Sequence, residues 1–248
     1  MIFVKSEREI DLMREPCAIV RDTLAAVGCA VRPGVSTAEL DRVAREYIRA
    51  RGAEPSCLGY CGYPASICAS VNEVIVHGIP SEDIVLKEGD IVSIDLCAYK
   101  NGFHGDGART FAVGAVSEEK QKLMRVTEEC FWKAVEHLRA GTPLYDIGAT
   151  VQAHAESNGF SVVREYVGHG IGREMHEDPS VPNYGKRGTG VRLRPGTVIC
   201  IEPMIAAGAR KVTVDEDGWT ARMADGKSAA HYENTVVVRE DGVEILTI

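Results

Sequence analysis

The sequence has no long apolar run. None of its stretches approaches the roughly 18 to 20 apolar residues that a membrane span needs, although 45% of its 248 residues are hydrophobic. The N-terminal segment also lacks the basic, apolar and small-residue order of a signal peptide, because charged residues appear within the first nine positions. We therefore expect a cytoplasmic protein without a membrane partner.

An excess of positive charge is missing as well. The 28 Lys and Arg residues are outnumbered by 36 Asp and Glu residues, which gives a formal net charge of −8. A nucleic-acid-binding surface depends on clustered basic side chains, so no nucleic-acid partner is expected. The sequence contains no Pro-, Gly- or Ser-rich linker and no low-complexity stretch. Residues 1–248 are therefore expected to form a single domain.

The sequence has no Cys-x-x-Cys pair, although it contains eight cysteines. Without such pairs a structural zinc knuckle is not expected. A chain of this length buries its own core, and a protein without a secretion signal has no need of a disulfide framework. Most of the cysteines are interpreted as small buried hydrophobic residues.

An internal repeat organises the chain. Residues 86–95, Leu-Lys-Glu-Gly-Asp-Ile-Val-Ser-Ile-Asp, match residues 193–202, Leu-Arg-Pro-Gly-Thr-Val-Ile-Cys-Ile-Glu, at an offset of 107 residues without a gap. An upstream segment recurs at an offset of 111, which a loop four residues shorter in the second half would reconcile. The matches predict a duplication into halves of about 1–115 and 116–248, related by a pseudo-twofold axis.

Each half predicts two helices followed by strands. Serine followed three residues later by glutamate, a capping box that begins a helix, occurs at Ser6 and again at Ser36. Gly52 ends the second helix, and Thr142 with Pro143 begins its counterpart in the second half. The acid-bearing segments are β-branched runs closed by turn residues and predict strands. The halves are expected to share one sheet and one core.

Asp95 stands inside an apolar strand, where an unpaired carboxylate would be costly. The Asn-Gly pair at 101–102 is a strong signal for a two-residue hairpin turn. Such a turn pairs Asp95 with Ala108. It also pairs Asp106 with Cys97, so both carboxylates lie on one face, close enough to reach a single ion. The alternative is an ordinary pair of turn and edge acids, which Asp106 alone would favour and Asp95, in the middle of a strand, does not.

Two further acids join this pair. The repeat places Glu202 opposite Asp95, so a pseudo-twofold axis would bring both to one centre. Glu233 opens another apolar strand, 232–238. Four carboxylates that converge without a counter-charge repel one another strongly. Two divalent cations would remove that repulsion.

One of the seven histidines, His169, stands out. It lies in the glycine-rich segment 168–172, where backbone approaches closely, and the Lys-Ser/Thr of a phosphate-cradling loop is missing. A metal ligand is therefore favoured. His77 and His176 lie in loop-like sequence, where each fits a cleft or the surface equally well. His104, His137 and His154 are interpreted as surface or packing residues. His231 is ambiguous, with packing favoured.

The ordered set of motifs resembles the type I methionine aminopeptidases of peptidase family M24. The motifs are Cys57-Leu-Gly-Tyr-Cys-Gly-Tyr-Pro64, Asn72-Glu-Val-Ile-Val-His-Gly-Ile-Pro80, Gly102-Phe-His-Gly-Asp106, Gly168-His-Gly-Ile-Gly172, Ile201-Glu-Pro-Met204 and Tyr232-Glu233. Each motif alone is weak, but the ordered set is specific and spans nearly the whole chain. The resemblance implies an α+β pita-bread fold, in which an antiparallel sheet is covered by helices, and a single catalytic domain over residues 1–248.

The resemblance also implies a dinuclear metal site. Its five-ligand pattern falls on Asp95, Asp106, His169, Glu202 and Glu233. Asp95 would be terminal on one metal and His169 with Glu202 on the other, whereas Asp106 and Glu233 would bridge. One imidazole and four carboxylates suit two divalent cations of Mn, Fe, Co or Zn.

The catalytic roles implied by the family fall on His77, His176 and Glu202. Glu202 would shuttle the proton, His176 would stabilise the oxyanion, and His77 would hydrogen-bond the scissile amide nitrogen. The methionine pocket would be lined by Cys57, Tyr60, Tyr63, Cys68, Trp219 and the two histidines.

Two positions depart from the family pattern. Met175 stands where Phe is commoner, and Cys61 stands where His is commoner. Both are expected at the rim of the methionine pocket. The reaction itself is expected to be unaffected by them.

The implied activity is removal of the initiator methionine from nascent polypeptides by a metal-bridged hydroxide, with a small second residue preferred. The N-termini of nascent polypeptides are the expected substrate, and transient association with the ribosome would be compatible with this function. The protein is expected to be a monomer. Prolidases and proline-specific aminopeptidases are the nearest rivals, but they usually carry an N-terminal domain for which this chain has no room. Type II methionine enzymes carry an insertion that is absent here. A metal-free binding module would have lost ligands, and none is lost.

Overall fold

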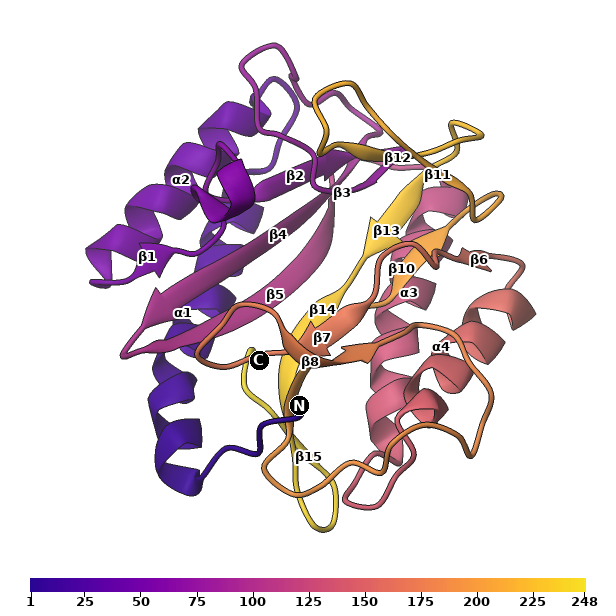
Figure 1. Cartoon of the computed structure of the whole chain (residues 1–248). Helices are drawn as coiled ribbons and strands as arrows, with labels where there is room; N and C mark the ends of the chain where they lie inside the picture. The colour runs from indigo at the N-terminus through magenta and orange to yellow at the C-terminus, as the bar shows by residue number, and fades with distance from the viewer.

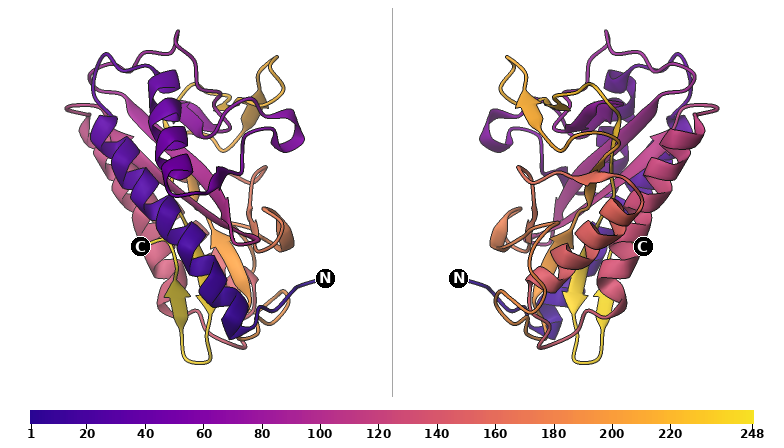
Figure 2. Two further views of the ribbon diagram at one scale, coloured as in Figure 1. Left: turned by 90° about the vertical axis from the view of Figure 1, so that its left-hand side faces the viewer. Right: turned by 90° about the vertical axis from the view of Figure 1, so that its right-hand side faces the viewer.

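The computed structural model describes all residues, 1–248. Two helix pairs cover one face of a curled antiparallel sheet (Figure 1). The first pair is α1 (Glu7–Ala30) with α2 (Thr37–Ala50), and the second is α3 (Glu118–Glu136) with α4 (Tyr145–Ser157). Viewed from the side, the long helices lie along one face, and loops with β11 (Val212–Val214) and β12 (Ala221–Met223) project from the other (Figure 2). No helix is both long and apolar enough to cross a membrane.

The main sheet has nine strands, of which seven follow the order β1-β4-β5-β14-β9-β7-β8, while β2 pairs with β4 and β15 with β14. Their bounds are β1 Glu54–Pro55, β2 Cys68–Val71, β4 Ile91–Lys100, β5 Phe103–Ala112, β7 Gly168–Gly170, β8 Glu177–Val181, β9 Val198–Ile201, β14 Glu233–Val238 and β15 Val243–Ile245. The central order β4-β5-β14-β9 is symmetric about the contact of β5 with β14.

Two three-stranded sheets flank the main one. The first joins β13 (Ala229–His231), β10 (Met204–Ala206) and β6 (Ser161–Val162). The second joins β11 (Val212–Val214), β12 (Ala221–Met223) and β3 (Val74–Val76). A short 3-10 helix, η1 (Tyr60–Gly62), follows β1.

The β4–β5 hairpin has the predicted register. Asp95 pairs with Ala108, and Cys97 pairs with Asp106. The two turn residues at 101–102 have φ values of 57° and 82°, the left-handed conformation that an Asn-Gly hairpin turn requires. The prediction that both carboxylates share one face of this hairpin is therefore confirmed.

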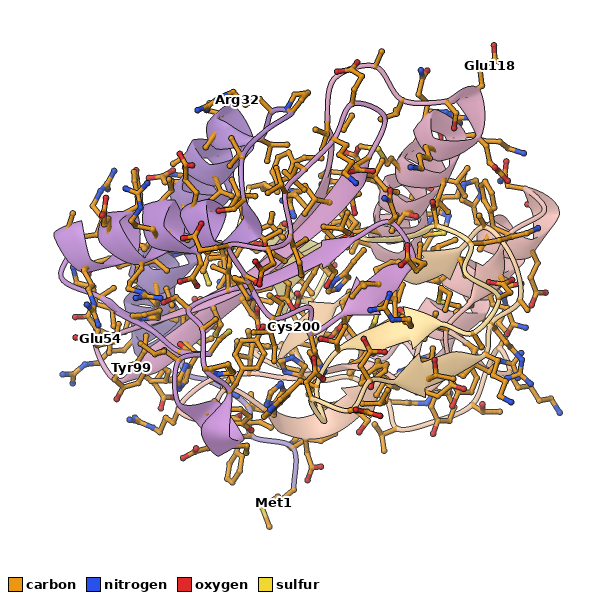
Figure 3. The ribbon with its side chains drawn as sticks, turned by 90° about the horizontal axis from the view of Figure 1, so that it is seen from above. Met1, Arg32, Glu54, Tyr99, Glu118 and Cys200 are labelled. Carbon is orange, nitrogen blue, oxygen red and sulfur yellow. The ribbon has the colours of Figure 1, made fainter.

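Backbone hydrogen bonds repeat at the offset of 107 residues. Gly34 donates to the carbonyl of Leu86 over 2.8 Å, and Gly141 donates to that of Leu193 over the same distance. Isolated bridges join Ser36 to Val85 and, at the corresponding positions, Pro143 to Arg192. Seen from above, the two helix pairs, which cover the same face of the sheet, lie at its left and right ends (Figure 3). The predicted duplication is thus present in the fold.

The length difference between the halves lies in a helix. Helix α1 has 24 residues, whereas its counterpart α3 has 19. The prediction of a shorter loop was therefore wrong, because the second half omits the last turn of its first helix.

The predicted helix starts are correct in the first half of the chain, whereas the predicted start of α4 in the second half is too early. Both hydrogen bonds of the capping box at Ser6 are present, and Ser36 caps α2 by accepting from Glu39. Helix α4 begins at Tyr145, so its predicted start at Thr142 and Pro143 was too early. The carbonyl of Thr142 accepts a hydrogen bond from Leu193, which keeps this segment paired with its neighbour outside the helix.

The shared sheet supports a divided apolar core. One cluster of 17 buried residues lies between the first helix pair and its half of the sheet. A second cluster, of 23 residues, lies mainly beneath α3 and α4. A third, of 11 residues, draws on both halves. The expectation of one core is corrected in this respect, because each helix pair buries its own half of the sheet.

Candidate active site

Four carboxylates meet at the centre of the main sheet, one from each central strand. Asp95 lies on β4 and Asp106 on β5, whereas Glu202 directly follows β9 and Glu233 begins β14. All four line a cavity of about 510 Å³. The cavity also contains His169, which β7 supplies. The structure thus brings together the five residues that the sequence singled out as ligands.

The imidazole of His169 faces the carboxylates through one nitrogen. Its Nε2 lies 3.6 Å from Oε1 of Glu202 and 3.8 Å from Oδ2 of Asp106. Its Nδ1 lies 2.9 Å from the carbonyl oxygen of Gly170. A proton on Nδ1 would satisfy that carbonyl and leave the Nε2 lone pair free, which is the arrangement of a histidine metal ligand. Burial lowers the pKa of His169 to about 3, which favours the neutral ring.

The carboxylates are buried together. Burial, followed by the charges of Asp95 and Glu202, raises the pKa of Asp106 well above its usual value. Burial also raises the pKa of Glu202 and Glu233, to which neighbouring acids add. Oδ1 of Asp106 and Oε1 of Glu233 have no hydrogen-bond partner. Buried carboxylate oxygens without donors are costly, so this set of groups fits a divalent metal centre.

Cys200 lies close to this centre. Its Sγ and one donor atom each of Asp106, His169 and Glu233 all lie within 4.8 Å of one another. It lies among the side chains near the middle of the molecule (Figure 3). Burial, with the charge of Glu233, raises the pKa of the Cys200 thiol well above its usual value. The thiolate is the form that binds metals, and Cys200 is absent from the cavity lining, so it packs beneath the carboxylates as a neutral thiol.

Aromatic and sulfur-bearing side chains form one wall of the cavity. The rings of Tyr63 and Trp219 meet edge to face with 5.1 Å between centroids. The hydroxyl of Tyr63 lies 3.1 Å from two backbone carbonyls, those of Ile67 and Gly78, and this fixes the ring. Further residues of the predicted pocket on the lining are Cys57, Tyr60 and Cys68.

The two non-ligand histidines border the same space. His77 adopts a φ of 59°, a left-handed conformation uncommon for a residue with a side chain. Burial lowers its pKa to about 4. The ring of His176 lies 4.3 Å from that of His169, and its Nδ1 lies 2.8 Å from the hydroxyl of Tyr60. Both histidines therefore line the cavity that contains the four carboxylates.

The two departures from the family pattern lie in different places. Met175 is buried and lines the cavity. Cys61 is exposed and does not line it. The expectation that both belong to the pocket rim is corrected for Cys61, because its side chain is exposed and takes no part in the cavity lining.

Sequence reasoning missed two residues. Tyr166 lines the cavity, and its ring meets that of His77 with 5.1 Å between centroids. It belongs to no motif, so no sequence signal marked it. His231, interpreted as a packing residue, lies 3.6 Å through Nε2 from Oε2 of Glu202. Its position two residues before Glu233 was the available signal.

A sequence model of metallopeptidase family M24 matches residues 11–240. The chain belongs to metallopeptidase family M24. The resemblance noted in the sequence is thereby confirmed, and membership of this family supports use of a divalent metal by the carboxylate–histidine centre.

Two methionine aminopeptidases match along the entire chain. A methionine aminopeptidase of Clostridium perfringens is 53% identical over 248 residues, which cover 100% of this chain and 99% of the relative. Methionine aminopeptidase 1 of Bacillus subtilis is 48% identical over 247 residues, with 100% and 99% covered.

Two solved structures share the fold of this chain. A methionine aminopeptidase of Thermotoga maritima superimposes with a TM-score of 0.98 at 44% identity, covering 100% of this chain and 99% of that one. A prolidase of Pyrococcus furiosus has a TM-score of 0.79 at 24% identity, with 99% of this chain and 65% of that one covered. The predicted pita-bread fold, an α+β fold with an antiparallel sheet covered by helices, is confirmed.

Proposed function

We propose that this M24 peptidase removes the N-terminal methionine from newly made polypeptides and prefers a small second residue. The observation that carries the proposal is that one cavity joins two chemistries. A wall of aromatic and sulfur-bearing side chains lies beside a buried cluster of carboxylates and histidine. Names of relatives that match the full chain at 48–53% identity support the same activity.

The buried cluster is proposed to hold two divalent cations of Mn, Fe, Co or Zn. Asp95 would hold one cation and His169 with Glu202 the other, whereas Asp106 and Glu233 would bridge by contributing ligands to both. The partnerless oxygens of Asp106 and Glu233 support the bridging role. When bound, the cations supply positive charge and a water activated for attack near neutral pH.

Three residues are proposed to handle protons and charge during hydrolysis. The Glu202 carboxylate accepts a proton from the attacking water and passes it to the leaving amine. His176 donates a hydrogen bond to the oxyanion that forms on the methionine carbonyl. His77 binds the scissile amide nitrogen. The position of both histidines on the lining of the cavity that holds the cluster supports these roles.

The side wall is proposed as the methionine pocket. Methionine is unbranched and polarisable, and its sulfur gains energy from contact with aromatic rings. The fixed rings of Tyr63 and Trp219 offer that contact. The other proposed pocket residues are Cys57, Tyr60, Cys68, His77 and His176. A charged side chain would lose its hydration in this pocket without gaining a partner.

The remaining assignments follow from this activity. Residues 1–248 act as one catalytic domain, and the protein works as a monomer in the cytoplasm. Its substrates are the N-termini of nascent chains, with which it meets the ribosome transiently. No nucleic-acid or membrane partner is assigned, because the net charge of −8 favours neither.

A matched peptide panel tests the proposal. Met-Gly, Met-Ala and Met-Ser peptides should be cleaved, whereas Met-Lys, Met-Leu and Met-Phe peptides should largely be spared. Norleucine in the first position should be partly accepted, because one methylene in an apolar pocket discriminates by only about 10- to 200-fold. Equal catalytic efficiency on Leu-Ala and Met-Ala peptides would indicate a general aminopeptidase. Preference for X-Pro peptides would indicate a proline-specific enzyme.

A further inference from the structure

The ring of His231 is buried without a hydrogen bond. The residue is 1% exposed, and neither ring nitrogen has a partner. Buried polar atoms in folded proteins almost always have partners, and an exception calls for a reason. Packing alone gives none, because an apolar side chain would fill the same space without the cost of two unpaired nitrogens.

The ring lies against two of the carboxylates. Its Nε2 is 3.6 Å from Oε2 of Glu202 and 3.9 Å from Oε2 of Glu233. On the other side, Nε2 of His169 is 3.6 Å from Oε1 of Glu202. The Glu202 carboxylate therefore lies between two imidazoles, each facing a different oxygen. Asp95 is near enough for its charge to act on His231 as well.

The two imidazoles differ in what they border. His169 lines the cavity that contains the four carboxylates, and His231 does not. His231 instead borders a smaller hollow, which Arg109, Thr110 and Tyr232 also line. The His231 ring therefore lies behind the carboxylates, on the side away from the cavity. A residue in this position can orient the metal-binding carboxylates without binding a metal itself. A direct ligand would be expected on the cavity side.

The backbone of His231 is held in place from both directions. Its N–H donates to Oγ1 of Thr110 over 3.0 Å, and the same hydroxyl donates to its carbonyl over 2.8 Å. In the pairing of β13 with β10, His231 stands opposite Met204. Met204 is two residues after Glu202, and Glu233 is two residues after His231. The ring is thus fixed relative to both carboxylates.

We propose that His231 is a positioning residue for the metal centre, which donates a ring N–H to Oε2 of Glu202 and so orients that carboxylate and its neighbour Glu233. A movement of about 0.6 Å brings the present 3.6 Å separation to a hydrogen bond. The inference rests on the proposed function only in treating the two glutamates as metal ligands. Hydrogen bonds of this kind fix the orientation of metal-binding carboxylates and raise metal affinity.

Two replacements of nearly equal shape separate donation from packing. Gln and Met have similar length and flexibility, but only Gln carries an N–H donor. Metal affinity is measured by calorimetry on metal-free protein, and the absorption spectrum is recorded for the Co(II)-loaded form. His231→Met should weaken metal binding by roughly 10- to 100-fold and change the spectrum. His231→Gln should restore affinity to within a few-fold of the unsubstituted protein.

The control is a histidine–glutamate pair elsewhere. His154 lies 2.8 Å through Nε2 from Glu129, on the helical side of the molecule, and His154→Met should leave metal affinity and spectrum unchanged. Wild-type affinity and spectrum in His231→Met would overturn the inference, as would equal losses in the Met and Gln variants. If His231→Met does not fold, ¹⁵N NMR of the His231 ring in metal-bound protein decides. A ring N–H that exchanges freely with water would then contradict donation.

These outcomes are independent of the substrate. Metal binding that depends on the His231 donor supports the inference even if methionyl peptides are not cleaved. Cleavage of methionyl peptides together with metal binding that is indifferent to His231 leaves the proposed function standing and refutes the inference.

Discussion

At the scale of residues, Glu202 combines the largest number of roles. It follows β9, faces His169 across 3.6 Å, and has a pKa that burial and Asp95 raise. Glu202→Gln removes the proposed proton acceptor and a negative ligand at once. Turnover on a Met-Ala-Ser peptide should fall by at least about 100-fold, whereas KM should change much less. Wild-type turnover in this variant would refute the role of Glu202.

His77 allows a different test. Its ring contacts Tyr166 and Trp219 and belongs to none of the ion pairs of the carboxylate cluster. His77→Ala should therefore keep both metals and slow hydrolysis by about 10- to 1,000-fold. Metal content by elemental analysis and turnover are read on the same sample. Loss of metal from His77→Ala would contradict the assignment of His77 as a non-ligand.

The residues of the site differ in how well the sequence marked them. Asp95 could be found because a carboxylate in an apolar strand conflicts with its surroundings. Glu202 could be found because the repeat places it on Asp95. Tyr166 could not be found, because it belongs to no motif. The position of His231 two residues before Glu233 was a signal, but a weak one, because its contact with Glu202 depends on which strands come together in the fold.

At the scale of elements, the start of α1 is held by one side chain. Ser6 accepts from the backbone of Glu9, whose side chain bonds back to the backbone of Ser6. Ser6→Ala should lower the free energy of unfolding by about 1 kcal/mol. Urea denaturation measures it, with Ser157→Ala near the end of α4 as the control, expected within about 0.5 kcal/mol of the parent. An equal effect of both substitutions would contradict a capping role for Ser6.

Elements with local signals could be predicted well. The turn at 101–102 fixed the register of β4 and β5 to the residue, because only a left-handed pair of residues closes that hairpin. The start of α4 was less predictable, since a backbone hydrogen bond from Leu193 holds Thr142 outside the helix. That bond depends on a partner about 50 residues away, which no local pattern contains.

At the scale of the molecule, the buried acids make stability depend on metal and pH. Burial raises the pKa of Asp106, Glu202 and Glu233. A carboxyl with a raised folded-state pKa stabilises the fold fully below its unfolded pKa of about 4. That contribution is lost as the pH rises through the folded-state value.

Metal-free protein should therefore lose thermal stability as the pH rises above about 4, and bound divalent metal should remove most of the loss. Unfolding midpoints at each pH, with metal and with chelator, measure this. Asp106→Asn serves as the control and should reduce the slope of the metal-free protein. A difference between metal-bound and metal-free midpoints that does not change with pH would contradict the account.

Reconstitution with metal shows whether hydrolysis depends on a centre of two cations. Metal-free protein is titrated with each divalent cation in turn, and hydrolysis of a Met-Ala-Ser peptide is followed against the number of metal equivalents bound. We expect no hydrolysis without metal, two bound equivalents of unequal affinity, and activity that returns as the centre fills. Full activity in excess chelator, with no metal found by elemental analysis, would contradict it.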